Sequence, residues 1–284
     1  MKRLVLLLAI IFFIIPIVKS QRLSVDIMPG FINYAGDLQP RSFTLNQANV
    51  AIQAGLSYRL TNNIYLRANY LAGSVGASDA KSGKPNLYTR NLSFNSIILE
   101  GSLCVEYDFF KIDEFKKWTP YIFAGGGYFF FNPYTHDSAG NKVYLQPLGT
   151  EGEGLPEYPN RKEYNLYQFN LQGGVGVKYA LSERVTVGFE ICERKLFTDY
   201  LDDVSTTYVD PSVLLYERGP EAVALAARGN ELNPPRAFPG VGAPRGNPGS
   251  KDTYYTGMFR FTYSFPSHPS LFNRKSMYCP RNIL

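Results

Sequence analysis

The chain has 284 residues, with 21 Tyr, 20 Phe and 25 Gly, and a formal net charge of +5. The basic residues are scattered and no nucleic-acid-binding motif accompanies them, so the sequence predicts no nucleic acid partner. Beyond the N-terminal segment, no apolar run approaches the ~18 residues of a membrane-spanning helix. A composition rich in aromatic residues and glycine, without such runs, indicates a membrane β-barrel, whose strands are amphipathic.

Residues 1–20 have the organisation of a signal peptide. Two basic residues precede the apolar run at 4–17. This run is shorter than the ~20 residues that a transmembrane helix needs. Val18 and Ser20 are small residues that predict cleavage before Gln21. A retained N-terminal anchor is the alternative.

Eight amphipathic stretches follow in chain order. We expect strands at residues 22–34, 47–60, 63–75, 92–109, 120–131, 164–180, 184–197 and 253–265. The connections between them alternate in length. Long ones fall at 35–46, 76–91, 132–163 and 198–252, and short ones at 61–62, 110–118 and 181–183.

The stretch at 92–109 shows the amphipathic pattern most clearly. Ile97, Leu99 and Leu103 alternate with Glu100 and other polar residues. Period-two alternation over this length predicts a strand, and an apolar face opposite a carboxylate-bearing face suits the wall of a transmembrane barrel. In two other strands the pattern is less regular. Pro29-Gly30 indicates a bulge, and the glycines at 125–127 leave the facing of their strand open.

The sequence therefore predicts an all-β fold, an eight-stranded antiparallel transmembrane β-barrel with long extracellular loops and short periplasmic turns. The barrel is expected at residues 21–265, followed by a periplasmic tail at 266–284. A soluble β-sandwich is the alternative. It would not place Tyr, Phe and Val on the outside of every strand.

Charged residues recur on the inward faces of these strands. An eight-stranded barrel is just wide enough to be filled by side chains, and buried charges need partners. We therefore predict a luminal charge network that fixes the register; a narrow ion path is the alternative. Its members are Asp26, Arg59, Arg67, Glu100, Glu106, Lys178, Glu190, Arg194 and Arg260.

No catalytic constellation is recognisable, so we predict a protein that is not an enzyme and has no cofactor. His136, Asp137 and Ser138 are consecutive and are expected to form a loop turn. The aspartates at 199, 202, 203 and 210 match no calcium loop, so no metal site is predicted, although Ca²⁺ binding is the alternative. The glutamates of residues 151–157 are expected to be solvated.

The segment at 198–252 is too long for an ordinary loop. Residues 220–227 begin with proline and predict a short helix. Residues 233–250 are rich in proline and glycine and predict irregular structure. Docking to a surface partner and a mobile insertion are both open interpretations of the segment.

Basic residues gather where the chain is expected to face the periplasm. They lie in the turn at 110–118 and in the tail. Together they predict a cationic periplasmic contact surface, with ordinary solvation as the alternative. The candidate contact residues are Lys111, Lys116, Lys117, Arg274, Lys275 and Arg281.

Several short strings resemble those of a Bacteroidota outer-membrane β-barrel family that includes the PorG barrel of the type IX secretion system. They include Gly36-Asp37-Leu38, Arg90-Asn91, the string at residues 145–152 and the string at 197–205, which contains Asp199, Tyr200, Asp202 and Asp203. Other strings of the same kind lie at 120–125 and 131–133.

The resemblance implies a non-enzymatic subunit of the outer membrane. Barrels of the PorG type associate with a periplasmic ring, built from a lipoprotein and a second protein, and act in secretion and gliding. The resemblance therefore implies these ring proteins and outer-membrane lipid as partners. A stand-alone barrel that binds a ligand through its extracellular loops is the alternative.

Overall fold

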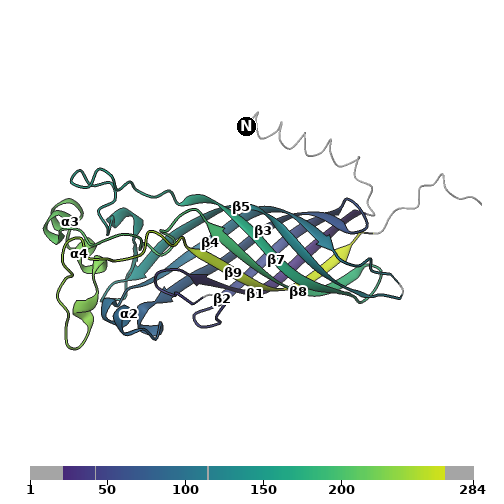
Figure 1. The fold of residues 1–284 in the computed structure, drawn as a ribbon, viewed down its shortest axis with the longest axis horizontal. Helices are drawn as coiled ribbons and strands as arrows, with labels where there is room; N and C mark the ends of the chain where they lie inside the picture. The colour runs from purple at the N-terminus through teal and green to yellow at the C-terminus, as the bar shows by residue number, and fades with distance from the viewer. Residues whose placement is uncertain (1–21, 42, 114, 266–284) are drawn as a thin grey trace, which may run out of the picture.

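The computed structural model describes residues 22–265, apart from 42 and 114. Eight long strands form one antiparallel sheet, which closes into a barrel because β1 pairs with β9 and β4 pairs with β5 (Figure 1). Their bounds are β1 Leu23–Ala35, β2 Asn49–Arg59, β3 Ile64–Ser78, β4 Ser93–Asp108, β5 Trp118–His136, β7 Tyr167–Ala180, β8 Val185–Leu196 and β9 Thr253–Ser264. The short strand β6, Lys142–Tyr144, extends the end of β5.

The predicted fold class is confirmed, and one strand differs clearly from its expected bounds. Strand β5 continues to His136 instead of ending at Phe131, so the loop expected from residue 132 begins five residues later. Strand β6 explains the extension, because its pairing of Tyr144 with Tyr134 satisfies backbone groups that a loop would leave to water.

The alternation of faces in β4 agrees with the prediction, and the structure decides the two open cases. In β5, Tyr121 and Phe123 point into the barrel, while the intervening Ile122 is exposed. The expected bulge at Pro29-Gly30 is wrong, because β1 pairs with β2 in one unbroken register from Leu23 to Ile32. Proline lacks an N–H group, and only the ladder to β9 is interrupted beside it.

The exterior of the barrel is apolar around its whole circumference. Every long strand presents exposed apolar side chains, among them Ile27 (β1), Val50 (β2), Leu66 (β3), Leu103 (β4), Ile122 (β5), Phe169 (β7), Ile191 (β8) and Phe259 (β9). Soluble proteins rarely expose continuous apolar patches above a few hundred Å². This exterior is that of a transmembrane barrel, whose strands alternate apolar-out and polar-in.

The helices of the described residues all lie at one end of the barrel (Figure 1). We name this end the cap; it is made by residues 36–48, 79–92, 137–166 and 197–252. The turn end, opposite, is made by residues 60–63, 109–117 and 181–184. None of the helices among the described residues is long and apolar enough to cross a membrane.

The cap contains three short helices, α2 Pro85–Arg90, α3 Pro211–Arg218 and α4 Pro220–Ala226. Helix α4 matches the predicted helix at 220–227. Helix α3 was not predicted, although its start has a recognisable cap: the Asp210 side chain accepts a hydrogen bond from Ser212 N at 2.8 Å. The predicted signal peptide and tail lie outside the described residues.

Gly125 on β5 provides a test of barrel closure. A Cβ atom there would collide with the backbone of Leu103 and lie 2.7 Å from Cα of Cys104, both on β4. We expect Gly125→Ala to destabilise the folded barrel by about 1–3 kcal/mol, as overpacking does. Urea titration of heat-modifiable migration on gels would measure it. Gly101→Ala is the control, because a Cβ at Gly101 meets no atom within 4 Å; equal effects would contradict this view of the packing.

Candidate functional site

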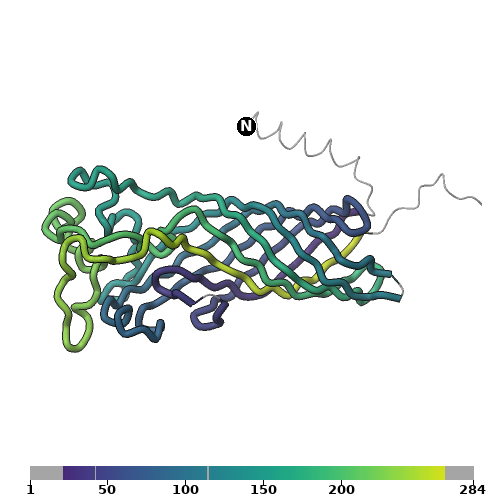
Figure 2. The backbone as a smooth tube through the Cα atoms, in the orientation of Figure 1, coloured from purple at the N-terminus to yellow at the C-terminus, as the bar shows by residue number. Residues whose placement is uncertain are grey.

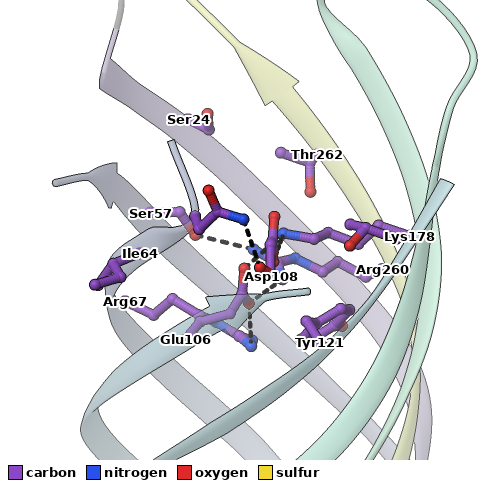
Figure 3. A network of polar contacts seen from close by, with 12 residues as sticks. Ser24, Ser57, Ile64, Arg67, Glu106, Asp108, Tyr121, Lys178, Arg260 and Thr262 are labelled. Atoms are coloured by element: carbon purple, nitrogen blue, oxygen red, sulfur yellow. Dashed lines mark hydrogen bonds and ion pairs between the residues drawn. The ribbon is translucent and has the colours of Figure 1, made fainter. Parts of the chain in front are cut away.

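The lumen contains a network of charges with Glu106 of β4 at its centre (Figure 3). The Glu106 carboxylate accepts hydrogen bonds from Arg67 at 2.9 Å, from Lys178 at 2.6 Å and from Arg260 at 2.6 Å. These three cations come from β3, β7 and β9. One carboxylate therefore ties four strands together across the interior.

Asp26 and Glu190 also belong to this cluster, which lies nearer the turn end. Arg260 donates to Asp26 at 2.9 and 3.1 Å, and Arg67 donates to Glu190 through two bonds of 3.0 Å. Tyr121 also donates to Glu190, at 2.7 Å. Because Asp26 lies on β1 and Arg260 on β9, this pair crosses the seam where the first and last strands meet.

A second cluster lies closer to the cap and is centred on Glu100. Arg194 Nε lies 2.9 Å from both carboxylate oxygens. Asn170 donates to the same carboxylate at 2.7 Å, and the Tyr254 hydroxyl also donates to it. Arg194 also donates a hydrogen bond to the Thr256 hydroxyl at 3.0 Å. Each charge in this cluster is buried and has an opposite charge beside it.

The structure thus places eight of the nine predicted luminal residues in two buried clusters. The ninth, Arg59, faces inward but lies half-buried at the turn end. The sequence-based set missed Asp108, whose carboxylate lies 2.8 Å from Lys178 Nζ. Asp108 follows Glu106 by two residues in the alternating strand, so the pattern contained the signal.

The cap brings together the residues that the sequence strings singled out. Arg90, at the end of α2, makes two bonds of 2.7 Å to Asp79 and one of 3.0 Å to the carbonyl of Asp37. It also donates to the carbonyl of Arg245. Asn91 ends the helix in a left-handed conformation, with φ 58°, and donates to the carbonyl of Arg228 at 3.1 Å. Leu38 is fully buried in the core of the cap, and Gly36 begins a tight turn there.

Arg245 is the second centre of the cap, and nothing in the sequence had indicated it. Its guanidinium lies 3.1 Å from Glu151 Oε1 and donates at 2.5 Å to the carbonyl of Asp203. Glu151 also accepts from the backbone N–H groups of Ser205 and Thr206, at 2.9 and 2.7 Å. The expectation that the glutamates of 151–157 are solvated is therefore wrong for Glu151.

Glu153 is buried as well, whereas Glu157 is exposed as expected. The Glu153 Oε2 atom accepts from Glu151 N at 3.0 Å, while Oε1 is buried without a hydrogen-bond partner. Local sequence gave no signal of this burial, since a run of glutamate, glycine and proline is typical of exposed loops.

The aspartates that follow β8 accept hydrogen bonds from other residues of the barrel and the cap. Tyr34 of β1 donates to Asp202 at 2.5 Å and to Asp252 at 3.1 Å. Asp203 accepts from Thr150 at 2.6 Å and from Tyr164 at 2.7 Å. These contacts join the strand ends to the loops above them.

The other two aspartates are also engaged. Asp199 accepts from Ser205 at 2.7 Å, and Asp210 caps α3. Tyr200, between them in the chain, stacks on Tyr164 with ring centroids 4.8 Å apart. Within residues 22–265, apart from 42 and 114, no group of three or more His, Cys, Asp or Glu side chains is arranged to hold a metal ion.

Three buried acidic groups of the cap have raised pKa values. Burial, with the charges of Asp203 and Glu151, raises the pKa of Glu153 to about 8. Burial raises the pKa of Asp203 to about 6, against the opposing effect of Arg245. Burial also raises the pKa of Asp199 to about 6. At neutral pH Glu153 therefore keeps a proton that it would release in water.

His136 and its neighbours are placed as a turn. Asp137 accepts hydrogen bonds from Ala139 N at 2.9 Å and from Asn141 N at 2.7 Å, which closes the hairpin between β5 and β6. His136 itself is exposed at the end of β5. These contacts are those of the predicted loop turn.

The turn end carries a cavity of about 540 Å³, lined among others by Arg59, Tyr65, Lys111 and Lys117. Beside it, Phe115 is 99% exposed at the tip of the turn between β4 and β5. The third predicted lysine, Lys116, instead lies over the ring of Phe110 at 3.2 Å. The predicted tail residues Arg274, Lys275 and Arg281 lie outside the described residues.

A second cavity, of about 560 Å³, opens in the cap. Its lining includes Asp37, Arg90, Tyr208, Arg236 and Arg245. Arg90 and Arg245 are already paired with carboxylates, whereas Arg236 is exposed at the cavity.

Residues 2–146 match a protein family described as "Domain of unknown function (DUF6089)". The chain belongs to this family. No curated protein matches the chain. The family description names no activity, so it does not assign a function to the cap or to the turn end.

Among solved structures, the chain is similar to Neisserial surface protein A, with 10% identity and a TM-score of 0.44 over 86% of this chain and 97% of that one. It is also similar to the attachment invasion locus protein Ail of Yersinia pestis, with 9% identity and a TM-score of 0.41 over 85% and 97%. The third is outer membrane protein W of E. coli, with 13% identity and a TM-score of 0.34 over 86% and 99%. The barrel is established by its own strand pairing and not by these likenesses.

Glu106 provides a test of the luminal network. We expect Glu106→Gln to destabilise the barrel by about 3–5 kcal/mol, because three buried cations lose their shared anion. Equilibrium unfolding in urea, followed by gel migration, would measure the loss. Glu183→Gln, in an exposed turn, is the control and should change stability by less than about 0.5 kcal/mol. A Glu106→Gln protein as stable as this control would contradict the pairing.

The raised pKa of Glu153 predicts that the cap loosens as pH rises. A carboxyl group whose folded pKa is about 8 keeps its proton in the folded cap but loses it near 4.5 in an opened one. Opening is therefore favoured increasingly between pH 4.5 and 8. We expect proteolysis of the cap, and its amide hydrogen exchange corrected for the intrinsic pH dependence of exchange, to increase over that range, and Glu153→Gln to reduce the increase. Glu157→Gln, at an exposed site, should leave the pH profile unchanged; a flat profile in the wild type would refute the prediction.

Proposed function

We propose that this chain is a non-enzymatic outer-membrane barrel and a structural subunit of the type IX secretion and gliding machinery. In this proposal the signal peptide directs export, the cap faces the cell exterior, and the turn end contacts a periplasmic ring formed by a lipoprotein and its partner.

The observation that carries the proposal is the division of the molecule into a filled interior and two exposed ends. Salt bridges occupy the lumen from Asp26, near the turn end, to Glu100, at the middle of β4. A lumen filled in this way suits a scaffold better than a wide channel. The surfaces available to partners are then the cap and the turn end.

The turn end supports a contact with an acidic protein. Lys111 and Lys117 are exposed around a cavity, and the fully exposed ring of Phe115 stands beside them. Interfaces commonly combine an aromatic anchor with a charged rim, and a cationic patch attracts a partner of opposite charge. A periplasmic ring protein with an acidic face fits this surface.

The assignment to the type IX secretion machinery comes from the resemblance in sequence. The strings at Gly36-Asp37-Leu38, Arg90-Asn91 and residues 198–203 meet within the cap, where they form its hydrogen-bonded frame. Strings that are far apart in the chain and close in space indicate that the resemblance reflects a shared cap. They support the secretion role only through the family that carries them.

The alternative is a stand-alone barrel that binds a ligand or surface partner through the cap. The cavity of about 560 Å³ favours it, because its lining includes Tyr208 and the exposed Arg236, which has no ion-pair partner among the described residues. The packing of residues 198–252 into the cap also favours a defined binding surface over a mobile insertion.

Charge reversal at the turn end would distinguish these functions. We expect the Lys111→Glu/Lys117→Glu double variant to lose co-purification with the ring proteins and to reduce export of type IX cargo, because it places anions against an acidic face. Lys162→Glu/Lys251→Glu, with exposed lysines in the cap, is the matched control and should retain both.

Two outcomes would count against the secretion role. Undiminished co-purification in the turn-end variant would remove this surface from the proposal. If the unmutated protein captures no ring protein and its deletion leaves cargo export intact, the stand-alone function is favoured instead.

A further inference from the structure

The loop between β1 and β2 does not stand above the barrel end with the rest of the cap. Its residues 43–47 fold back over the outer wall, beside β1 and β9, as Figure 2 shows. The amide of Asn33, on the outward face of β1, donates to the carbonyls of Thr44 at 2.5 Å and Asn46 at 3.0 Å. The loop is therefore fastened to the face of the wall that turns away from the lumen.

This attachment covers polar groups that would otherwise face lipid. Asn33 lies directly opposite Tyr255 in the sheet, and its amide also donates to the Tyr255 hydroxyl at 3.1 Å. Asn33 is fully buried and Tyr255 nearly so, although both point outward. An uncovered amide on a lipid-facing wall would lose its hydrogen bonds at considerable cost. The loop supplies those bonds.

The outer side of the loop is apolar. Phe43 is 61% exposed and Leu45 is 68% exposed, and the Phe43 ring lies 5.1 Å from that of Tyr255. Phe43 has a φ of 54°, a left-handed conformation that is rare for a bulky side chain. Such strain persists only where the surroundings impose it. Here the bonds from Asn33 hold the backbone so that the two apolar side chains point outward.

The loop lies at the edge of the lipid-facing apolar band that is nearer the cap. Phe31 pairs with Val50 just beside it, and Val50 is strongly exposed. The outward residue of β8 that pairs with Tyr255 is Glu193, which is charged and exposed. The change from apolar to charged residues therefore falls at Tyr255. Aromatic side chains at this height are typical of the membrane–water interface.

Three cations lie on this loop or on the segment next to it: Arg41, two residues before Phe43, and Lys81 and Lys84 in the neighbouring loop. Arg41, Lys81 and Lys84 are exposed, and none of them has an ion-pair partner among the residues that the structure describes. Asn46 donates to the carbonyl of Lys81 at 3.2 Å, which places the segment of Lys81 next to the loop. Cations at the border of an apolar membrane surface attract anionic headgroups.

We propose that Phe43 and Leu45, together with Arg41, Lys81 and Lys84, form a binding surface for anionic lipid in the outer leaflet. We name it the lipid flap. Acyl chains pack on Phe43, Leu45 and Val50, and the headgroup phosphates meet the three cations. A lipid suits this surface better than a protein does, because the surface continues the apolar band of the wall and faces the same way.

Tryptophan fluorescence in membranes tests the apolar part. In a Trp118→Phe background, which removes the chain's one tryptophan, Phe43→Trp would place the probe on the lipid flap. We expect brominated phospholipid to quench it strongly and acrylamide to quench it weakly. Leu45→Trp serves as a second probe if Phe43→Trp folds poorly, as judged by heat-modifiable migration.

Phe115→Trp in the same background is the control, because Phe115 is 99% exposed at the turn end. It should show the reverse pattern, with strong acrylamide quenching and weak bromolipid quenching. If the flap probes behave like this control, the loop lies in water, the proposal is overturned, and a protein partner becomes the better occupant.

The anionic part has its own test. At equal mole fraction, brominated anionic phospholipid should quench the Phe43→Trp probe more than brominated zwitterionic phospholipid does. Arg41→Ala/Lys81→Ala/Lys84→Ala should abolish that difference while leaving the zwitterionic quenching unchanged. Equal quenching by the two lipids in the unaltered flap would refute the preference for anionic headgroups.

Discussion

The fold depends on one constraint: a barrel with an apolar exterior must place its charges inside, and there each charge needs a partner. Glu106 meets this constraint for Arg67, Lys178 and Arg260 together. Removing paired ions from water costs about as much as their attraction returns, so such a network specifies an arrangement more than it adds stability. The consequence is a fixed register, because a shift by one residue would turn these charges toward lipid.

The cap obeys the same rule with a different solution. Its loops bury carboxylates around Arg90 and Arg245, and where cations are too few it keeps protons instead, as the raised pKa of Glu153 to about 8 indicates. The cap is thus a small folded layer and not a set of independent loops. Its shape depends on contacts between strand ends and loops, such as those of Tyr34 with Asp202 and Asp252.

Strand positions and most of the luminal charges followed from the sequence, because the two-residue repeat is local and a membrane wall enforces it along every strand. The cap did not follow in the same way. Glu151 is buried by Arg245, 94 residues away, and no local pattern announces such a partner. The fold-back of Phe43 over the wall depends on Asn33, whose outward amide looks unremarkable in sequence. The wrong expectation for Glu151 and the unpredicted position of Phe43 both concern places where tertiary contacts decide burial.

The seam between β1 and β9 has a consequence for biogenesis. Asp26 lies on the first strand, β1, and its partner Arg260 lies on the last strand, β9. Until that strand arrives, Asp26 lacks its cation, Glu106 lacks one of three, and the sheet has two open edges. A chain that ends before β9 leaves an open sheet whose unpaired edges and carboxylates are unfavourable in lipid. The last strand therefore closes the sheet and pairs these charges at the same time. Insertion into the membrane can then be completed only by a polypeptide that includes it.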